Sequence, residues 1–404
     1  MPRRGLRTAL ATAAVLAAFL ARPPARAAGP DPEVPARYRH LHEGLVRALD
    51  GWERRMDRRP AAAGRPVWAG ELLVANANRG EELLRPGALQ GVRVFLDRFV
   101  NLGLGGVTVS VSFPLLAPDF PRARDYEAFY REVAREVRSR GLTLDVETGL
   151  LFANTAFSPV RFDYGTLSWD QLVRGRRAHT EAVLRATSPD YLDIGAEPDT
   201  EARLAGQQRL DDPEGRVALI RSVLSGLDRG RTRVAAGIGT WSDAAFVRAC
   251  LAGAGLDAIA LHIYPLGRRT LDTTYEVLDL ARRAGKPVLV DECWLYKAGP
   301  GEGQSIAANE AVFQRDLWSF WAPLDQRFLA LVDRFARQEA VAFVSPFWSH
   351  QYFAYLEYAP ALDGLPYREA NARHLRHVRM AAEGGGLSPT GDFLRRMLAP
   401  APGP

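Results

Sequence analysis

This chain of 404 residues lacks the marks of several common protein classes. Its two cysteines, Cys250 and Cys293, are too few for a disulfide framework, and we expect two buried thiols. After the first 28 residues, no apolar run is long enough to cross a bilayer. The first predicted strand runs into VANANRGEE, which lacks the GxGxxG of a dinucleotide-binding turn. These absences argue against a disulfide-stapled scaffold, an integral membrane protein and a nucleotide-binding open sheet.

Residues 1–28 predict a signal peptide rather than a structural element. Arg3, Arg4 and Arg7 precede the short apolar run ALATAAVLAAFLA, and the small-residue site ARA follows at 25–27. The PRRGL start is weakly similar to a twin-arginine signal. We therefore expect a secreted or periplasmic protein without a membrane segment after cleavage.

The charge balance gives no indication of a polyanionic partner. The whole chain has a formal net charge of +5 and a pI of about 9.3. Five of the 52 basic residues, but none of the 47 acidic ones, lie in residues 1–28, so the mature chain carries equal numbers of both. A basic surface for nucleic acid is therefore not expected.

Residues 29–62 form a linker and a polar N-terminal helix, which is predicted at 37–59. After residue 62, short apolar runs alternate with helical patterns such as 124–141, 271–285 and 324–338. Eight runs predict strands, at 67–75, 106–113, 142–150, 191–196, 233–239, 257–264, 287–292 and 340–347. This alternation is typical of an α/β protein with a (β/α)8 (TIM) barrel. We place a single-domain barrel at 63–385 and a C-terminal tail with one helical patch at 386–404.

Functional residues in such a barrel gather at the carboxyl ends of the strands. In strand order, the predicted ends carry Asn76 and Asn78, Glu147, Glu197, Trp241, His262 and Tyr264, Glu292 and Trp294, and finally Trp348 and His350. Glu197 follows the fourth strand and Glu292 ends the seventh, so the two can approach one ligand from different sides of the barrel mouth. Cleavage of a glycosidic bond requires such a pair, with one carboxyl group protonated and the other ionised.

In this order the motifs resemble the clan of retaining (β/α)8 glycoside hydrolases that includes endo-glucanases, mannanases and galactanases. The matching segments are GAEPD around Glu197, LHIYP around His262 and Tyr264, VLVDECW around Glu292, and SPFWSH around Trp348. The resemblance covers the barrel. It implies a retaining hydrolase that acts on a β-linked oligo- or polysaccharide, and it implies no metal or organic cofactor.

Carried over from the clan, Glu197 is expected to be the acid/base and Glu292 the nucleophile. Tyr264 would hydrogen-bond the nucleophile, His262 would line the cleft, and Trp348 would form the floor beneath the sugar. The other predicted substrate contacts are Asn76, Asn78, Glu147, Trp241, Trp294 and His350. For Glu147, which has the same strand parity as Asp145, a structural ion pair inside the barrel is the alternative.

One position departs from the clan's pattern, because its asparagine before the acid is Ala196 here. That asparagine normally holds the sugar 2-OH, a contact that strengthens in the transition state. Either Asn76, Asn78 or Asn154 takes over this contact, or the substrate differs at C2, or catalysis has been lost. The last case defines the alternative function, a non-catalytic glycan-binding barrel.

Two further interpretations concern other chemistry near the mouth. A metal-dependent hydrolase or isomerase would use Asp145, Glu147, Glu197 and His262, but the chain has neither an HxH on its first strand nor an HExxH. The glycine-rich AGPGEGQS at 298–305 has no lysine for a phosphate loop, and we interpret it as a mobile lid beside Glu292.

Overall fold

The computed structural model describes residues 33–59, 64–264, 266–299, 302 and 310–400, and the described residues from Val34 onward form one compact unit. The predicted signal peptide, residues 1–28, lies outside the described residues, as does most of the glycine-rich segment predicted as a lid. Among the helices that are described, none is both long and apolar enough to span a membrane.

The sheet consists of eight parallel strands, one in each predicted segment. They are β1 Val67–Trp68, β2 Gly106–Ser110, β3 Thr143–Glu147, β4 Tyr191–Asp193, β5 Arg233–Gly239, β6 Ala258–Ile263, β7 Val288–Cys293 and β8 Phe343–Pro346. Neighbours pair in the order β1-β8-β7-β6-β5-β4-β3-β2, and a parallel bridge between Glu71 and Thr108 joins the two ends. The predicted (β/α)8 barrel is confirmed.

The first strand is much shorter than the predicted 67–75. The chain leaves the sheet after Trp68 and continues as two 3-10 segments, η3 Leu73–Ala75 and η4 Ala77–Leu84. Leu72 and Ala75 are nevertheless fully buried. An apolar run is buried in either conformation, so hydropathy alone could not distinguish strand from turn here.

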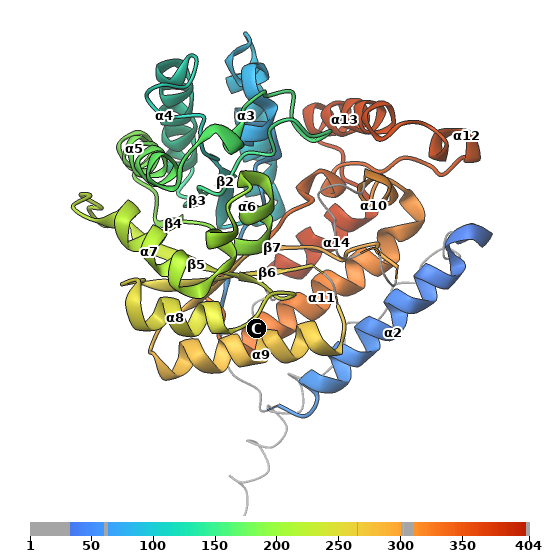
Figure 1. Cartoon of the computed structure of the whole chain (residues 1–404). Helices are drawn as coiled ribbons and strands as arrows, with labels where there is room; N and C mark the ends of the chain where they lie inside the picture. Colours follow the sequence, from blue (N-terminus) through green and yellow to red (C-terminus); the bar gives the residue numbers. More distant parts are fainter. Residues whose placement is uncertain (1–32, 60–63, 265, 300–301, 303–309, 401–404) are drawn as a thin grey trace, which may run out of the picture. The chain divides into compact units, whose positions relative to one another are not determined.

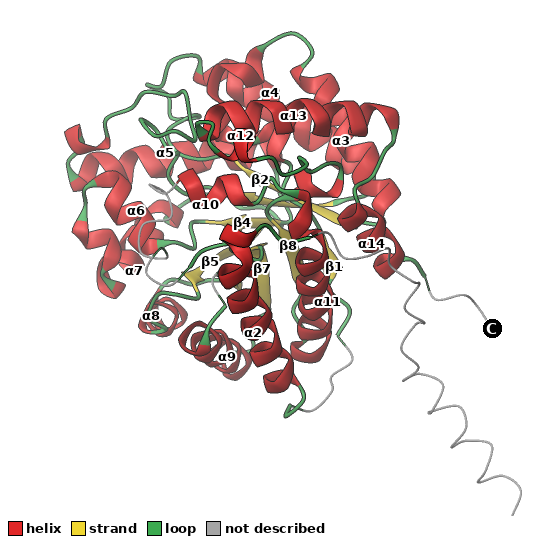
Figure 2. Ribbon diagram, turned by 90° about the vertical axis from the view of Figure 1, so that its right-hand side faces the viewer, coloured by secondary structure: helices red, strands yellow, loops and turns green. Residues whose placement is uncertain are grey.

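Helices surround the sheet (Figures 1 and 2). Those that follow β1 to β8 are α3 Ala88–Leu102, α4 Ala123–Ser139, α5 Trp169–Thr187, α6 Pro198–Ala205, α7 Pro213–Leu224, α8 Ala245–Gly253, α9 Arg268–Arg283, α10 Glu310–Arg315, α11 Ala322–Glu339, α12 Pro360–Asp363, α13 Tyr367–Gly384 and α14 Pro389–Leu398. Short 3-10 helices are η2 Ala36–Tyr38, η5 Tyr164–Thr166, η6 Gln208–Asp211, η8 Ser319–Trp321 and η9 Ser349–Tyr352. In α4, Tyr126, Tyr130 and Val133 recur every three or four residues and are buried, so its apolar stripe faces the barrel.

The two ends of the described chain both pack on this ring of helices. The predicted N-terminal helix is α2 Arg39–Met56, whose Trp52 is buried against Phe328 and Phe335 of α11, and Figure 1 shows α2 beside α11. At the other end, α14 packs between α11 and α3, with Leu394 fully buried. The helical patch expected in the tail at 386–404 is therefore α14, and it packs on the helices around the barrel.

Candidate active site

Glu197 stands where the fourth strand turns into a helix. After β4, residues 194–196 leave the sheet, and Pro198 begins α6 directly behind Glu197. Proline has no N–H to give to a strand and its fixed φ suits the first helical position, so Glu-Pro ends one element and starts the next. The Glu197 side chain is consequently presented at the barrel mouth, 22% exposed.

Glu292 reaches the same mouth through an irregularity in β7. The pairing of β6 with β7 runs from Ala260–Leu289 to His262–Glu292, so β7 contains one residue more than β6 over this stretch. An extra residue of this kind re-aims the side chains around it. As a result, both Asp291 and Glu292 lie on the interior side, although consecutive strand residues normally point to opposite faces.

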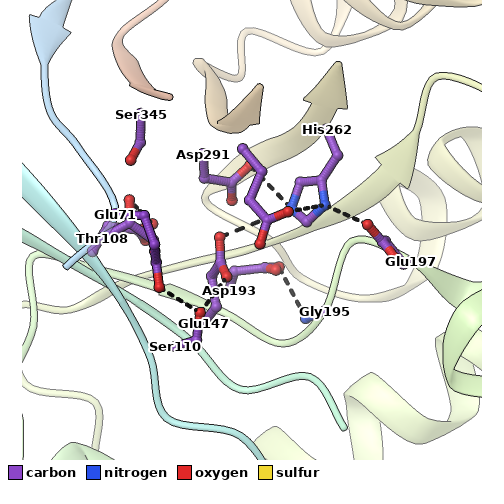
Figure 3. A network of polar contacts seen from close by, with 12 residues as sticks. Glu71, Thr108, Ser110, Glu147, Asp193, Gly195, Glu197, His262, Asp291 and Ser345 are labelled. Atoms are coloured by element: carbon purple, nitrogen blue, oxygen red, sulfur yellow. Dashed lines mark hydrogen bonds and ion pairs between the residues drawn. The ribbon is translucent and has the colours of Figure 1, made fainter. Parts of the chain in front are cut away.

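His262 lies between the two glutamates. Its Nδ1 is 3.0 Å from Oε1 of Glu197, a contact drawn in Figure 3. The same nitrogen is 3.4 Å from Oε2 of Glu292. One oxygen of each carboxyl group therefore flanks the same ring nitrogen. This closeness is compatible with the roughly 5–5.5 Å separation of the two carboxyl groups in a retaining pair.

Tyr264 contacts Glu292 from the end of β6. Its hydroxyl donates to Oε2 of Glu292 over 2.5 Å. Burial raises the pKa of Glu292, while the positive charge of His262 and this hydrogen bond act in the opposite direction. The predicted hydrogen bond from Tyr264 to the predicted nucleophile is therefore present.

Beneath these groups lies a set of five carboxyl side chains that we call the interior acid cluster: Glu71, Asp145, Glu147, Asp193 and Asp291. Each is at most 7% exposed. Burial raises the pKa of all five, and for Glu71 and Asp193 to about 8. A buried acid that keeps its proton avoids the cost of an unpaired buried charge.

Ser110 gives geometric support for this protonation (Figure 3). Its Oγ lies 2.8 Å from Oε1 of Glu71 and 3.2 Å from Oε2 of Glu147. A hydroxyl group has one hydrogen to donate, so one of the two contacts needs a hydrogen from the acid. The prediction for Glu147 offered an ion pair as the alternative to a substrate contact; its closest cationic atom is Nε2 of His262, at 3.9 Å.

His262 carries the positive charge of this interior. Burial alone would lower its pKa, but the carboxylates of Glu292 and Glu197 and of Asp291 outweigh it and raise the pKa to about 10. Its other nitrogen, Nε2, lies 3.7 Å from Oδ1 of Asp291. The imidazolium is thus placed between the two glutamates at the mouth and the acids below.

Some of these side chains have the donor types that divalent cations prefer. Within the described residues, three sets of ligand atoms lie within 4.8 Å of one another: Glu147, His262 and Glu292; Asp193, His262 and Asp291; and Asp145, Glu147 and Asp291. Glu197 belongs to none of them, so the four residues of the metal hypothesis do not form one ligand set. That no metal takes part stays a prediction.

The site opens into a cavity of about 460 Å³, a size suited to a small organic ligand. Eight of the predicted site residues line it: Asn76, Asn78, Glu147, Glu197, Trp241, His262, Tyr264 and Glu292. Aromatic rings make up much of the remaining wall, contributed by Phe152, Tyr296, Phe313 and Phe347. Such rings can pack on the apolar C–H faces of a sugar.

Trp241 is held over the end of β5. Its indole Nε1 donates to Oδ2 of Asp199 over 3.1 Å. A Cβ at Gly239 would come within 2.3 Å of the indole ring, so only glycine leaves room for the ring in this place. The two contacts fix the aromatic wall on the β5 side of the cavity.

Three residues predicted as substrate contacts are not among those that line the cavity. Trp348, the first, is partly buried and packs edge-on against Phe347, with ring centroids 5.0 Å apart, and it is Phe347 that lines the cavity. Trp294 is fully buried between Phe328 of α11 and Tyr352, outside the cavity lining.

His350, the third, is a core residue. Its ring packs edge-on against Phe95 of α3, with centroids 5.9 Å apart, and it lies near His374 of α13. Burial lowers its pKa well below the usual range, so it is a neutral histidine. Both Trp294 and His350 follow strand ends in the sequence, but each fills space between the barrel and its helices.

The missing clan asparagine has one candidate replacement. Ala196 lines the cavity, as do Asn76 and Asn78, whereas Asn154 donates to the carbonyl of Phe162 away from the lining. The amide nitrogen of Asn76 donates to Oε1 of Glu71 over 3.1 Å. Asn78 uses its carbonyl oxygen to accept from Phe152 N over 2.8 Å, which leaves its amide hydrogens directed to no described residue.

Sequence reasoning missed several residues that line the cavity. Among them are Glu201 and Arg203 of α6 and Arg269 of α9. An arginine or glutamate in an amphipathic helix is expected to face water, and no local signal marked these three.

The two cysteines are buried, as predicted. Cys250 and Cys293 are both free thiols in the structure.

Comparison with known proteins bears on the fold. No protein-family model matches the chain, and no curated protein does. The exo-beta-1,4-mannosidase Op5Man5 from Opitutaceae bacterium strain TAV5 superposes with a TM-score of 0.51 at 16% identity, over 85% of this chain and 62% of that protein. A protein described as GH5_18 from Bifidobacterium longum subsp. longum ATCC 55813 gives 0.50 at 13% identity, over 82% of this chain and 78% of that one.

At these identities the likeness shows a shared fold. Both neighbours are glycoside hydrolases with a (β/α)8 barrel, the architecture that the motif order around Glu197 and Glu292 implied. The chain is thus a (β/α)8 barrel with two glutamates converging on one histidine at its mouth.

Proposed function

We propose that this protein is a retaining glycoside hydrolase that acts on β-linked carbohydrate. The observation that carries the proposal is the convergence of Glu197 and Glu292 on Nδ1 of His262, in a cavity lined by aromatic rings. The shared contact with one ring nitrogen is compatible with the close spacing of a retaining pair of carboxyl groups, and the resemblance of the motifs to a retaining clan favours the same reaction. The barrel shared with a β-mannosidase supports the same class.

In the first step, a carboxylate oxygen of Glu292 attacks the anomeric carbon and the bond to the leaving oxygen breaks. Glu197 gives its proton to that oxygen. In the second step, Glu197 takes a proton from water, whose oxygen attacks the anomeric carbon and releases Glu292. The side-chain exposures suit these roles, since Glu197 at 22% can exchange its proton with water, while Glu292 at 13% is held by Tyr264.

The proposal extends to the place of action. The predicted signal peptide assigns the mature enzyme to the periplasm or the exterior of the cell, where polysaccharide is available. The alternative is a barrel that binds a glycan without cleaving it, which Ala196 favours because the usual contact to the 2-OH is missing at that position.

Reducing-sugar release by the mature protein, measured on a panel of β-linked polysaccharides and oligosaccharides, tests the proposal. The matched variant is Glu292→Gln, which keeps the size of the side chain and removes its nucleophilic oxygen. We expect release by the wild type and a loss of at least roughly 10³-fold in the variant. Binding of a glycan without release by the wild type would instead establish the alternative, and unchanged release in the variant would remove Glu292 as nucleophile.

A further inference from the structure

A buried group of three charged side chains lies behind Glu197. Nη1 of Arg176, from α5, is 3.0 Å from Oε1 of Glu201, and Nη1 of Arg216, from α7, is 2.5 Å from Oε2 of the same carboxylate. Both arginine side chains are at most 1% exposed, and Glu201 is at 4%. We call this group the Arg–Glu–Arg triad.

The triad contacts the backbone that carries Glu197. Arg176 donates from Nη2 to the carbonyl oxygen of Ile194 over 2.7 Å, and Arg216 donates from Nη2 to the carbonyl oxygen of Gly195. The N–H of Glu201 donates to the carbonyl oxygen of Glu197 over 2.9 Å. Both arginine side chains of the triad therefore bond to main-chain oxygens of this segment, whereas the bond from the Glu201 N–H is the first backbone bond of α6.

Gly195 shows how closely the triad fits this segment. Its φ is +121°, in the region that favours glycine, and a Cβ there would come within 2.6 Å of Nη2 of Arg216 and 2.7 Å of Oε1 of Glu201. The turn between β4 and α6 and the triad thus occupy adjoining space, and a change in one must displace the other.

The charges of the triad hold it together. Burial would raise the pKa of Glu201, but the guanidinium groups of Arg176 and Arg216 outweigh it and lower the pKa. The carboxylate is thus ionised and accepts one bond from each arginine. Two guanidinium groups paired with one carboxylate leave a net positive charge. Hydrogen bonds to the carbonyl oxygens of Ile194 and Gly195 partly offset this charge.

We infer that the Arg–Glu–Arg triad is the positioning device of the acid/base residue: it fixes the turn 194–197 and thereby the direction in which Glu197 presents its carboxyl group. The inference rests on the proposed function. None of the three side chains needs to touch substrate. Their effect reaches the reaction through the orientation of Glu197, and a displacement of about 1 Å in such a group can cost about 10²-fold in rate.

The test compares two substrates that differ in their need for an acid, a 2,4-dinitrophenyl β-glycoside and a phenyl β-glycoside. In the first step the enzyme is glycosylated and the phenol group leaves. Dinitrophenolate is a weak base and leaves without a proton, whereas phenolate is a stronger base and depends on Glu197 to protonate its oxygen. In Glu201→Gln we expect kcat/KM to fall about 10²-fold for the phenyl substrate and only a few-fold for the dinitrophenyl substrate. Arg174→Lys, on the exposed side of α5, is the control and is expected to change neither.

Azide gives a second readout. It attacks the anomeric carbon of the glycosyl-enzyme, displaces the carboxylate of Glu292 and forms a glycosyl azide, and it needs no base. We expect azide to restore turnover of the dinitrophenyl substrate in Glu201→Gln. If that variant does not fold, as its thermal melting would show, Arg176→Lys, which keeps the charge but loses one of the two bonds, is expected to give the same pattern.

An equal fall for both substrates without rescue by azide, or unchanged kinetics in folded Glu201→Gln, would overturn the inference. Failure of the proposed function is distinguishable from this. It would appear in the wild type, as no turnover of either glycoside, and would overturn the positioning role together with the function.

Discussion

Tyr264 donates its hydroxyl hydrogen to the same oxygen of Glu292 that lies 3.4 Å from Nδ1 of His262. One carboxylate oxygen therefore has a neutral donor on one side and a cationic group on the other. Both favour the ionised form, against the burial that favours the protonated one. For a proposed nucleophile this balance decides the pH at which it can attack.

Replacing Tyr264 by phenylalanine should move that balance. A hydrogen bond to a charged group contributes about 1.5–3 kcal/mol, which corresponds to a pKa rise of about one to two units at Glu292. Activity requires the ionised form, so the acidic limb of the kcat/KM profile should move to higher pH by that amount. The control is Tyr296→Phe, because Tyr296 also lines the cavity but its buried hydroxyl has no hydrogen-bond partner among the described residues. Equal profiles for the two variants would contradict the role of Tyr264.

The barrel and its carboxylates could be predicted from sequence because they depend on local patterns. Parallel strands covered on both faces are apolar along their length, and the chain must turn at their ends. A polar residue at such an end is therefore expected at the mouth, although His350 shows that packing can place one in the core instead. Glu197, His262 and Glu292 were found in this way.

Other features depend on contacts between elements far apart in the chain. The extra residue in β7 turns Asp291 inward, and only the register with β6 reveals it. Arg176 and Arg216 lie on helices, where the local pattern assigns arginine to the water-facing side, yet both reach Glu201 in the interior. Trp294 was misplaced for the same reason, since the space it fills is created by Phe328 of α11.

Asn78 is expected to replace the missing asparagine in binding the sugar 2-OH. Asn78 lines the cavity and its amide nitrogen has no hydrogen-bond partner among the described residues, whereas the amide nitrogen of Asn76 already donates one hydrogen to Glu71. Asn78→Ala should lower kcat/KM by about 5- to 10-fold, the equivalent of one hydrogen bond of about 1 kcal/mol. On a 2-deoxy substrate the wild type and the variant should be equal. Asn154→Ala is the control, and a loss of the same size on both substrates would exclude the assignment.

Gly195→Ala should destabilise the protein more than Gly206→Ala. Both residues have positive φ, +121° and +63°, but a Cβ at Gly206 would meet nothing within 4 Å, whereas one at Gly195 would meet Arg216 and Glu201. We expect about 1 kcal/mol of unfolding free energy to be lost at Gly206 and more than about 3 kcal/mol at Gly195. Urea unfolding of the two variants measures the difference in unfolding free energy. Equal losses of unfolding free energy would show that Arg216 and Glu201 can move away from a Cβ at position 195 without destabilising the protein.

The interior acid cluster should make stability depend on pH in a defined direction. Burial, and then the charge of Glu292, raise the pKa of Glu71 from an ordinary 4.5 to about 8. Between these values the folded protein binds a proton that the unfolded chain has lost. Stability is therefore greatest below the lower value and falls as pH rises through the window, by at most about 1.4 kcal/mol per pH unit for this one group.

Glu71→Gln isolates that contribution, because a glutamine amide resembles the protonated acid in shape and hydrogen bonding but does not titrate. Unfolding free energies of the wild type and the variant should be similar near pH 5, and the wild type should become the less stable of the two as pH approaches 8. His262, whose pKa is raised to about 10, adds a fall of the same sign, but it is present in both proteins and leaves their difference unchanged. Glu132→Gln, on the exposed side of α4, should keep the wild-type dependence. A constant difference between Glu71→Gln and the wild type across this range would mean that Glu71 is ionised in the folded protein.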